Sequence, residues 1–258
     1  MELNKIYNED CLEGMKKIPD KSVDMILCDL PYGTTRNKWD TVIPLDELWE
    51  QYNRIIKDNG AIVLTAQTPF DKVLGTSNLK MLKYEWIWEK TTATGWFNAK
   101  KMPMKAHENI LVFYKKPPVY NYEKTKGHKP TNSYTKRVDV INKSTTYGKV
   151  KKDMSGGGET ERYPRSVIKF STDKQKNSIH PTQKPVALFE YLIKTYTNEG
   201  ETVLDNCMGS GTTAIACINT NRNYIGFEMD EEYYKASLER IEKHKEEWNK
   251  ENGQYEFR

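Results

Sequence analysis

A carboxylate, backbone carbonyls and an aromatic ring stand together at residues 29–32 of this 258-residue chain, where the sequence reads Asp29, Leu30, Pro31, Tyr32. Proline stiffens this turn. An exocyclic amine on a base needs such groups, because its lone pair is delocalised into the ring. Acceptors at the Asp29 side chain and the Leu30 carbonyl would aim that lone pair at an electrophile, while Tyr32 stacks on the base. Taken alone, the segment also fits a proline turn with a surface tyrosine.

A glycine turn in the last third of the chain predicts a nucleoside cofactor. Gly209 and Gly211 lack a Cβ, so backbone can approach a ligand closely there. A helix predicted to begin near Thr212 would present unpaired amides to the same ligand. Glu228 lies 19 residues after Gly209, where dinucleotide folds carry a ribose-binding carboxylate. This pattern also arises by chance, so it does not identify the cofactor.

Short runs of Val, Ile and Leu alternate with longer amphipathic stretches, which predicts strands and crossover helices around a mostly parallel sheet. We expect strands at residues 3–7, 23–28, 61–65, 84–88, 110–114, 202–204 and 224–227. We expect helices at residues 11–17, 45–57, 69–75, 185–195, 212–220 and 231–248. This order is typical of a doubly wound α/β fold.

Carboxylates follow four of these predicted strands: Asp10, Asp29, Asp205 and Glu228. In an open parallel sheet, ligands bind beyond the carboxyl ends of the strands. We therefore expect the four side chains around one site.

Positive charge is concentrated in one segment. The chain has a formal net charge of +4, but residues 115–177 hold 13 Lys and 3 Arg against 6 acidic residues, a net charge of +10 that leaves −6 elsewhere. Residues 115–178 show no clear periodicity apart from a strand-like piece at 166–170, which predicts an insertion or a flexible arm. The charge favours a polyanion-binding insertion, with a solvated lysine-rich loop as the alternative.

Other sequence features argue against several classes of protein. The four cysteines form no CxxC pair and the four histidines no HExxH pattern, so we expect buried thiols and no zinc site, disulfide framework or catalytic metal. No run approaches the roughly 20 apolar residues of a membrane helix. The N-terminus lacks the pattern of a signal peptide. We expect a soluble, cytoplasmic protein.

Three segments together resemble the amino-DNA methyltransferases. DLPY at residues 29–32 resembles their (D/N/S)PPY catalytic motif, and DNCMGSG at residues 205–211 resembles their FxGxG cofactor motif. HPTQKP at residues 180–185 is similar to a segment of the same family. The order of the motifs, with a basic insertion between them, resembles the β group, whose Rossmann-like fold is circularly permuted. This chain departs from the pattern at Leu30 and at residues 206–209, which lack the usual phenylalanine.

The resemblance implies a domain plan and an activity. Residues 1–114 would form the catalytic half, residues 115–178 a basic target-recognition insertion, and residues 179–258 the cofactor-binding half. The activity would be transfer of a methyl group from S-adenosylmethionine to N6 of adenine in double-stranded DNA. The base would be flipped out and would attack directly, without a covalent intermediate.

Carried over by position, the resemblance also implies residue roles. Residues Asp29, Leu30, Pro31 and Tyr32 would be catalytic. Four residues would surround the methionine part of the cofactor: Asp205, Gly209, Gly211 and Thr212. Glu228 would hold the ribose hydroxyls, Asp10 the adenine amine, and Lys184 would close the site near the methionine carboxylate. For Asp10, capping of the following helix is an alternative, and Glu228 also suits an acidic helix N-terminus.

Contacts to DNA are expected from the insertion and from two loops. Three arginines of the insertion are candidates: Arg137, Arg162 and Arg165. The loops at residues 34–39 and 91–101 should lie beside the pocket. The sequence also allows a homodimer. Because no nuclease motif is present, any restriction endonuclease that acts with this protein would be a separate polypeptide.

Three other functions remain open. The first is methylation of N4 of cytosine, although an aspartate such as Asp29 is more typical of the adenine members of the family and a serine of the cytosine members. The second is a nicotinamide-dependent oxidoreductase, which the glycine turn favours and residues 29–32 oppose. The third is a catalytically silent DNA-binding module.

Overall fold

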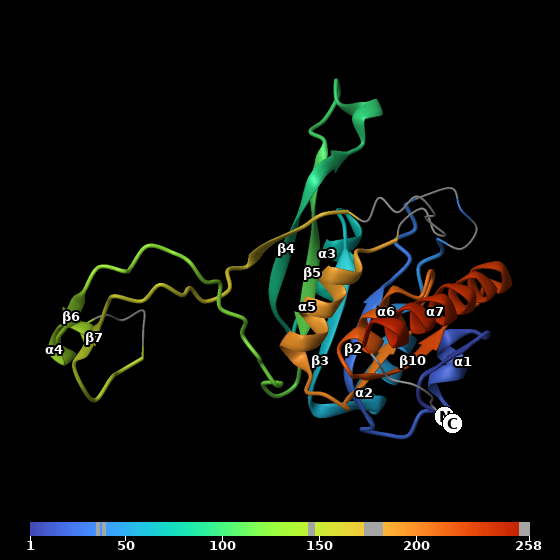
Figure 1. The fold of residues 1–258 in the computed structure, drawn as a ribbon, viewed down its shortest axis with the longest axis horizontal. Coiled ribbons are helices and arrows are strands. Elements are labelled where there is room, and N and C mark those ends of the chain that lie inside the picture. Colours follow the sequence, from blue (N-terminus) through green and yellow to red (C-terminus); the bar gives the residue numbers. More distant parts are fainter. Residues whose placement is uncertain (35–36, 38–39, 144–147, 173–182, 253–258) are drawn as a thin grey trace. The chain divides into compact units, whose positions relative to one another are not determined.

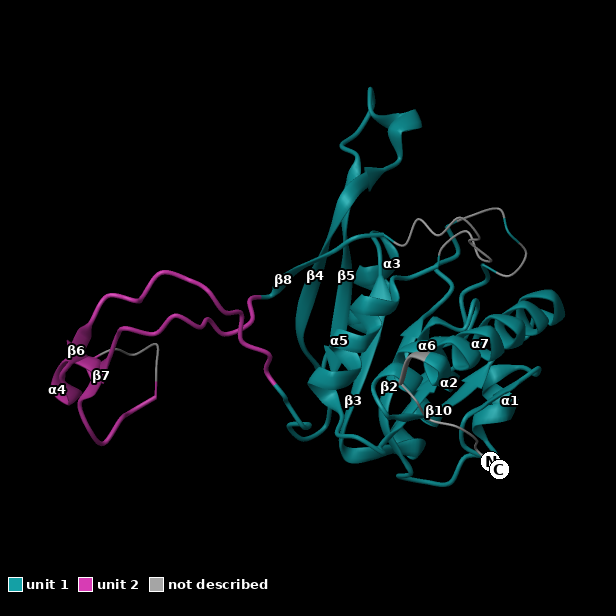
Figure 2. Ribbon diagram, viewed as in Figure 1, with its two compact units in different colours: residues 1–121, 166–258 teal, residues 122–165 magenta. Residues whose placement is uncertain are grey.

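Strand β2 (Val23–Asp29) is apolar on both faces and lies near the middle of an eight-stranded sheet. The structure, a computed structural model, describes residues 1–34, 37, 40–143, 148–172 and 183–252. It divides into two compact units, Met1–Asn121 with Ser166–Arg258 and Tyr122–Arg165 (Figure 2). The large sheet belongs to the first unit.

The sheet has the strand order β1-β10-β9-β2-β3-β5-β4-β8 (Figure 1). Its other strands are β1 (Lys5–Tyr7), β3 (Ile56–Ala66), β4 (Leu82–Thr94), β5 (Lys105–Phe113), β8 (Val167–Phe170), β9 (Thr202–Asp205) and β10 (Asn223–Phe227). Neighbours from β1 to β3 pair in parallel, whereas β5 runs antiparallel to both β3 and β4. The mostly parallel sheet expected from the sequence therefore carries one reversed strand, whose direction a strand pattern alone does not reveal.

Two groups of helices cover the two faces of the sheet (Figure 1). Their bounds are α1 (Cys11–Met15), α2 (Leu45–Ile55), α3 (Phe70–Ser77), α5 (Val186–Tyr196), α6 (Thr212–Asn219) and α7 (Glu231–Asn252). Successive side chains of a strand point to opposite faces. Accordingly, Ile26 and Cys28 pack into the core formed with α1, α2 and α3, while Met25 and Leu27 pack into the core formed with α5, α6 and α7. The predicted doubly wound α/β fold is confirmed.

The point where the strand order reverses lies between β9 and β2. The chain runs from β9 through α6 to β10 on one side, and from β2 through α2 to β3 on the other. Met25 pairs with Val203 and Ile26 with Leu204 in parallel register. The two strands therefore end side by side, which brings Asp29 and Asp205 to one crevice at the topological switch point.

Two further features lie outside this layered body. Strands β4 and β5 continue as a long hairpin that projects from the sheet and carries a short 3₁₀ turn, η1 (Trp96–Asn98), at its end (Figure 1). The second unit contains β6 (Tyr134–Lys136), α4 (Val138–Ile141) and β7 (Met154–Gly156), with β6 antiparallel to β7. Between residues 115 and 178 the sequence indicated only the strand-like piece at 166–170, which forms β8 of the large sheet. The elements of the second unit were not expected, because strands of three residues and a helix of four are too short for a pattern to identify reliably.

None of the helices in the described part of the chain is both long and apolar enough to cross a membrane.

Candidate active site

The carboxyl ends of β2 and β9 open into a cavity of about 1020 Å³ within the first unit. Pockets for one small ligand usually measure about 300–1,000 Å³, so a cofactor and a base would fit together. Gly211, the N-cap residue of α6, is not among the residues that line this cavity. All the other residues predicted to be catalytic or to bind the cofactor line it: Asp10, Asp29, Leu30, Pro31, Tyr32, Lys184, Asp205, Gly209, Thr212 and Glu228.

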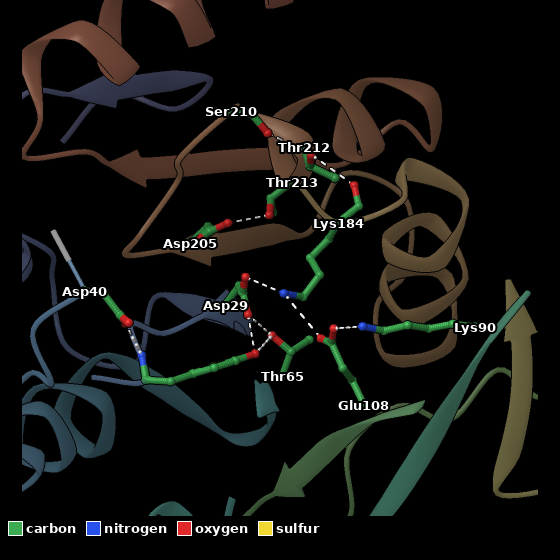
Figure 3. Close-up of polar contacts among 11 residues, drawn as sticks. Asp29, Asp40, Thr65, Lys90, Glu108, Lys184, Asp205, Ser210, Thr212 and Thr213 are labelled. Carbon is green, nitrogen blue, oxygen red and sulfur yellow. Dashed lines mark hydrogen bonds and ion pairs between the residues drawn. The ribbon is translucent and has the colours of Figure 1, made fainter. Parts of the chain in front are cut away.

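Asp29, the last residue of β2, is held by three donors from separate parts of the chain (Figure 3). One carboxylate oxygen, Oδ1, accepts hydrogen bonds from the hydroxyls of Tyr32, at 2.6 Å, and Thr65. The other, Oδ2, lies 2.5 Å from the Nζ of Lys184. Thr65 is fully buried near the end of β3. These contacts fix the direction of the carboxylate in the cavity.

Lys184 begins a chain of buried charges behind Asp29 (Figure 3). Its Nζ lies 3.4 Å from Oε2 of Glu108, and Oε1 of Glu108 lies 2.5 Å from Nζ of Lys90. The side chains of Lys184, Glu108 and Lys90 are only 6%, 5% and 6% exposed. Negative and positive charges therefore alternate, as burial of several charged groups requires.

The ionisation of this chain follows from its neighbours. Burial acts to raise the pKa of Glu108, but Lys184 and Lys90 hold it below its usual value. Burial acts to lower the pKa of Lys184, but the carboxylates of Asp29 and Glu108 hold it above its usual value. Both groups are therefore charged at neutral pH.

The turn after Asp29 is closed by Asp40. Its Oδ1 accepts the backbone N–H groups of Tyr32 and Gly33 at 2.7 and 2.8 Å, and its Oδ2 accepts that of Thr34 at 2.9 Å. The ring of Tyr32 stacks on Phe70, with 5.3 Å between ring centroids. Burial raises the pKa of Tyr32, so its hydroxyl remains a proton donor to Asp29.

The two glycines of the cofactor turn have different surroundings. Gly209 and Gly211 both have positive φ, +52° and +79°. A Cβ on Gly209 would meet nothing nearer than the Cys207 carbonyl oxygen at 3.9 Å, so the cavity remains open to a ligand there. A Cβ on Gly211 would lie 3.0 Å from Ile241 of α7. Gly209 therefore permits ligand approach, whereas Gly211 permits close packing between helices.

Two carboxylates, Asp205 buried and Glu228 partly buried, border the same turn. Asp205 accepts hydrogen bonds from the Thr213 hydroxyl and, at 3.0 Å, from the Cys207 N–H, and its burial raises its pKa to about 6. Glu228 accepts the N–H groups of Gly209 and Asp230 at 2.7 and 2.9 Å, and burial raises its pKa as well. Glu228 thus ties the end of β10 to the glycine turn.

Other predicted site residues make structural contacts of their own. Asp10 caps α1, because its Oδ1 accepts the N–H groups of Leu12 and Glu13 at 2.8 and 3.1 Å. The Thr212 hydroxyl lies 3.3 Å from the carbonyl oxygen of Lys184. This contact joins the start of α6 to the segment before α5. The ligand roles assigned to Asp10, Lys184 and Thr212 stay predictions.

The arginine candidates all lie in the second unit. Arg162 donates to the carbonyl oxygens of Glu159, Glu161 and Lys129, which ties two segments of that unit together. Arg137 and Arg165 are exposed. Residues 35, 36, 38 and 39 of the first expected DNA loop, and residues 180–182 of the HPTQKP segment, lie outside the described residues. Among described side chains, no group of three His, Cys, Asp or Glu could hold a metal ion.

Four residues of the site escaped sequence reasoning: Lys90, Glu108, Thr65 and Asp40. Glu108 and Lys90 flank apolar strand patterns, where charged residues are usually exposed. The antiparallel register of β4 with β5 places these two residues side by side, and that register is not visible in one sequence. Asp40 stands in a stretch without periodicity.

Known proteins with similar sequences and folds are DNA-modifying enzymes. The family model described as DNA methylase matches residues 23–239. DNA adenine methyltransferase YhdJ of Escherichia coli (strain K12) is 30% identical over 256 residues, covering 93% of this chain and 83% of YhdJ. The crystal structure of the M1.HpyAVI-SAM complex is 27% identical with a TM-score of 0.62, covering 92% of this chain and 98% of that one.

A likeness in fold extends to the PvuII DNA methyltransferase, described as cytosine-N4-specific. It has a TM-score of 0.66 and 17% identity, and covers 95% of this chain and 91% of that one.

We predict that Glu108→Gln lowers the free energy of unfolding by about 3 kcal/mol, because it leaves two buried ammonium groups without the carboxylate between them. The matched control is Glu89→Gln, on the neighbouring strand β4, which removes an exposed pair with Lys169. The Glu89→Gln substitution should lower the free energy of unfolding by less than about 1 kcal/mol. Urea denaturation of both variants tests this difference, and equal losses would contradict the importance of the buried chain.

We also predict a pH dependence from Asp205. Its pKa of about 6 lies above that of an unfolded aspartate, so the folded chain binds a proton more tightly at this position. The unfolding free energy contributed by Asp205 therefore falls as pH rises toward 6. From about pH 4.5 to about pH 7, the wild type should lose about 2 kcal/mol more stability than the Asp205→Asn variant. The measurement is urea denaturation of both proteins across this pH range. If their unfolding free energies changed with pH by the same amount, burial would not perturb the pKa of this carboxyl.

Proposed function

Because this chain belongs to the family of DNA methyltransferases of the N6-adenine and N4-cytosine type, whose cofactor is S-adenosylmethionine, we propose that it methylates N6 of adenine in double-stranded DNA. The observation that carries this proposal is the Asp29 carboxylate, held by Tyr32, Thr65 and Lys184 in a cavity that also contains the glycine turn.

The cofactor half of the cavity has features that fit S-adenosylmethionine. The open space at Gly209 admits a ligand against the backbone, and Asp205 and Glu228 line the same cavity. We assign cofactor binding to these residues together with Thr212 and Asp10. When bound, S-adenosylmethionine supplies an electrophilic methyl group.

Asp29 has room for one more hydrogen bond. A carboxylate offers about four lone-pair sites, and Tyr32, Thr65 and Lys184 use three of them. No other described residue takes the fourth, which would accept an N–H of the target amine. A second N–H bond to the Leu30 carbonyl would turn the nitrogen lone pair toward the methyl donor. No covalent nucleophile is needed for this attack.

Entry of a base into this cavity requires its removal from the duplex, which costs a few kcal/mol of stacking and pairing. We assign the phosphate contacts that offset this cost to the basic segment, residues 115–178, including Arg137 and Arg165. Arg162, whose guanidinium binds backbone carbonyls, serves that segment by holding its shape. The same proposal includes a cytoplasmic location, a homodimer as one form of the enzyme and a separate restriction endonuclease.

Adenine is favoured over cytosine by Asp29 and by the relatives. YhdJ is described as an adenine methyltransferase at 30% identity, whereas the cytosine-N4-specific PvuII enzyme shares 17%. N4 of cytosine is the second candidate, because one carboxylate and one carbonyl would hold either amine.

We predict that DNA from cells expressing the enzyme contains N6-methyladenine. The DNA is digested to nucleosides, which are separated and identified by mass spectrometry, with DNA from cells expressing no enzyme as the control. A methyl group only on deoxycytidine would overturn the adenine assignment and leave the role of Asp29 standing. No added methyl group on any base would refute the proposed activity.

We predict that the basic segment carries much of the non-specific affinity for DNA. Neutralising Lys149, Lys151 and Lys152 together should reduce the slope of log affinity against log salt by up to about 2.7, the value for three phosphate contacts. Neutralising Lys235 and Lys245 on α7 is the control. Fluorescence anisotropy with duplex DNA measures the slopes, and an unchanged slope in the triple variant would mean that these lysines are only solvated.

A further inference from the structure

The end of the β4–β5 hairpin exposes large apolar side chains. Trp96 and Phe97 are 66% and 82% exposed, and their rings stack on each other with 4.0 Å between centroids. Met102 and Met104, on the returning side of the hairpin, are 54% and 40% exposed. Exposed apolar groups gathered in this way are typical of binding surfaces.

The charge of the same hairpin identifies the kind of partner. Between residues 91 and 107 there are three lysines, Lys100, Lys101 and Lys105, and no Asp or Glu. Aromatic rings beside uncompensated lysines fit a partner that combines flat apolar faces with negative charge. Nucleic acid has both features, since its bases stack on aromatic rings and its phosphates bind lysine.

The hairpin rises from the rim of the active-site cavity. Residues of both its strands line that cavity: Trp88, Lys90 and Thr94 of β4, and Lys105 and Glu108 of β5. Thr94 and Lys105 pair across the two strands, and residues 95–104 form the projecting end (Figure 1). This end contains the 3₁₀ turn Trp96–Asn98 and projects from the sheet, beyond the strands that line the cavity (Figure 1). A duplex whose target base enters the cavity would therefore meet the end of the hairpin beside that base.

We propose that Trp96 and Phe97 insert into the duplex and occupy the space left by the extracted base, while Lys100 and Lys101 bind the flanking phosphates. This inference rests on the proposed function. Extraction of a base leaves two neighbouring base pairs without a stacking partner, and apolar side chains that enter such gaps stabilise the distorted duplex. The target would thus be drawn into the cavity and kept from returning.

The test compares Trp96→Ala/Phe97→Ala with Leu79→Ala, a control whose side chain is 64% exposed and does not line the cavity. Methyl transfer from labelled S-adenosylmethionine to duplex DNA should fall about 10- to 100-fold in kcat/KM for the double variant, the loss expected from base–aromatic stacking. The control should match the wild type. Calorimetry should give both variants the wild-type affinity for S-adenosylmethionine.

A second measurement isolates the insertion step. A fluorescein-labelled duplex with a central abasic site already contains the gap, so the wild type should bind it more tightly than the intact duplex. The double variant should lose that preference. The inference is overturned if the double variant keeps the preference or the activity, or if sedimentation shows that it loses a wild-type dimer. A wild type that methylates no DNA refutes the proposed function itself.

Discussion

The ion pair between Lys184 and Asp29 is the contact on which the rest of the site depends. A carboxylate that is to hold a target amine, as we propose for Asp29, has to stay in place in the cavity, and buried charges are tolerated only when paired. Lys184 supplies that pairing from a segment 155 residues later in the chain. Glu108 and Lys90 then balance the charge of Lys184 from β5 and β4. The position of Asp29 is therefore determined by the packing of the whole sheet.

The strand order divides the site into two sides, each built from a different part of the chain. Because β9 and β2 lie at the topological switch point, one side of the crevice is built from β9, β10 and their helices, and the other from β2, β3 and theirs. Gly209, Asp205 and Glu228 belong to the first side, and Asp29 with Tyr32 to the second. A cofactor on one side and an acceptor amine on the other would meet at Asp29. In this chain the acceptor side comes first in the sequence and the cofactor side last.

The sequence was informative where residue types coincide with strand ends. Asp29, Asp205 and Glu228 could be assigned to one site because each follows an apolar run, and parallel strands share one carboxyl edge. The ion pair of Lys184 with Glu108 could not be predicted, since it depends on the antiparallel register of β5. Its pair with Asp29 joins segments 155 residues apart, which no local pattern reveals. The two glycines looked alike in the motif, and only packing against α7 separates Gly211 from Gly209. The short strands of the second unit had no detectable pattern.

We propose that Asp29 serves the acceptor amine while the other side of the crevice holds the cofactor. Isothermal titration calorimetry of the Asp29→Ala variant with S-adenosylmethionine, beside its rate of methyl transfer to DNA, tests this division most directly. We predict that the variant binds the cofactor almost as tightly as the wild type but transfers no measurable methyl. Loss of cofactor affinity as severe as the loss of activity would contradict it.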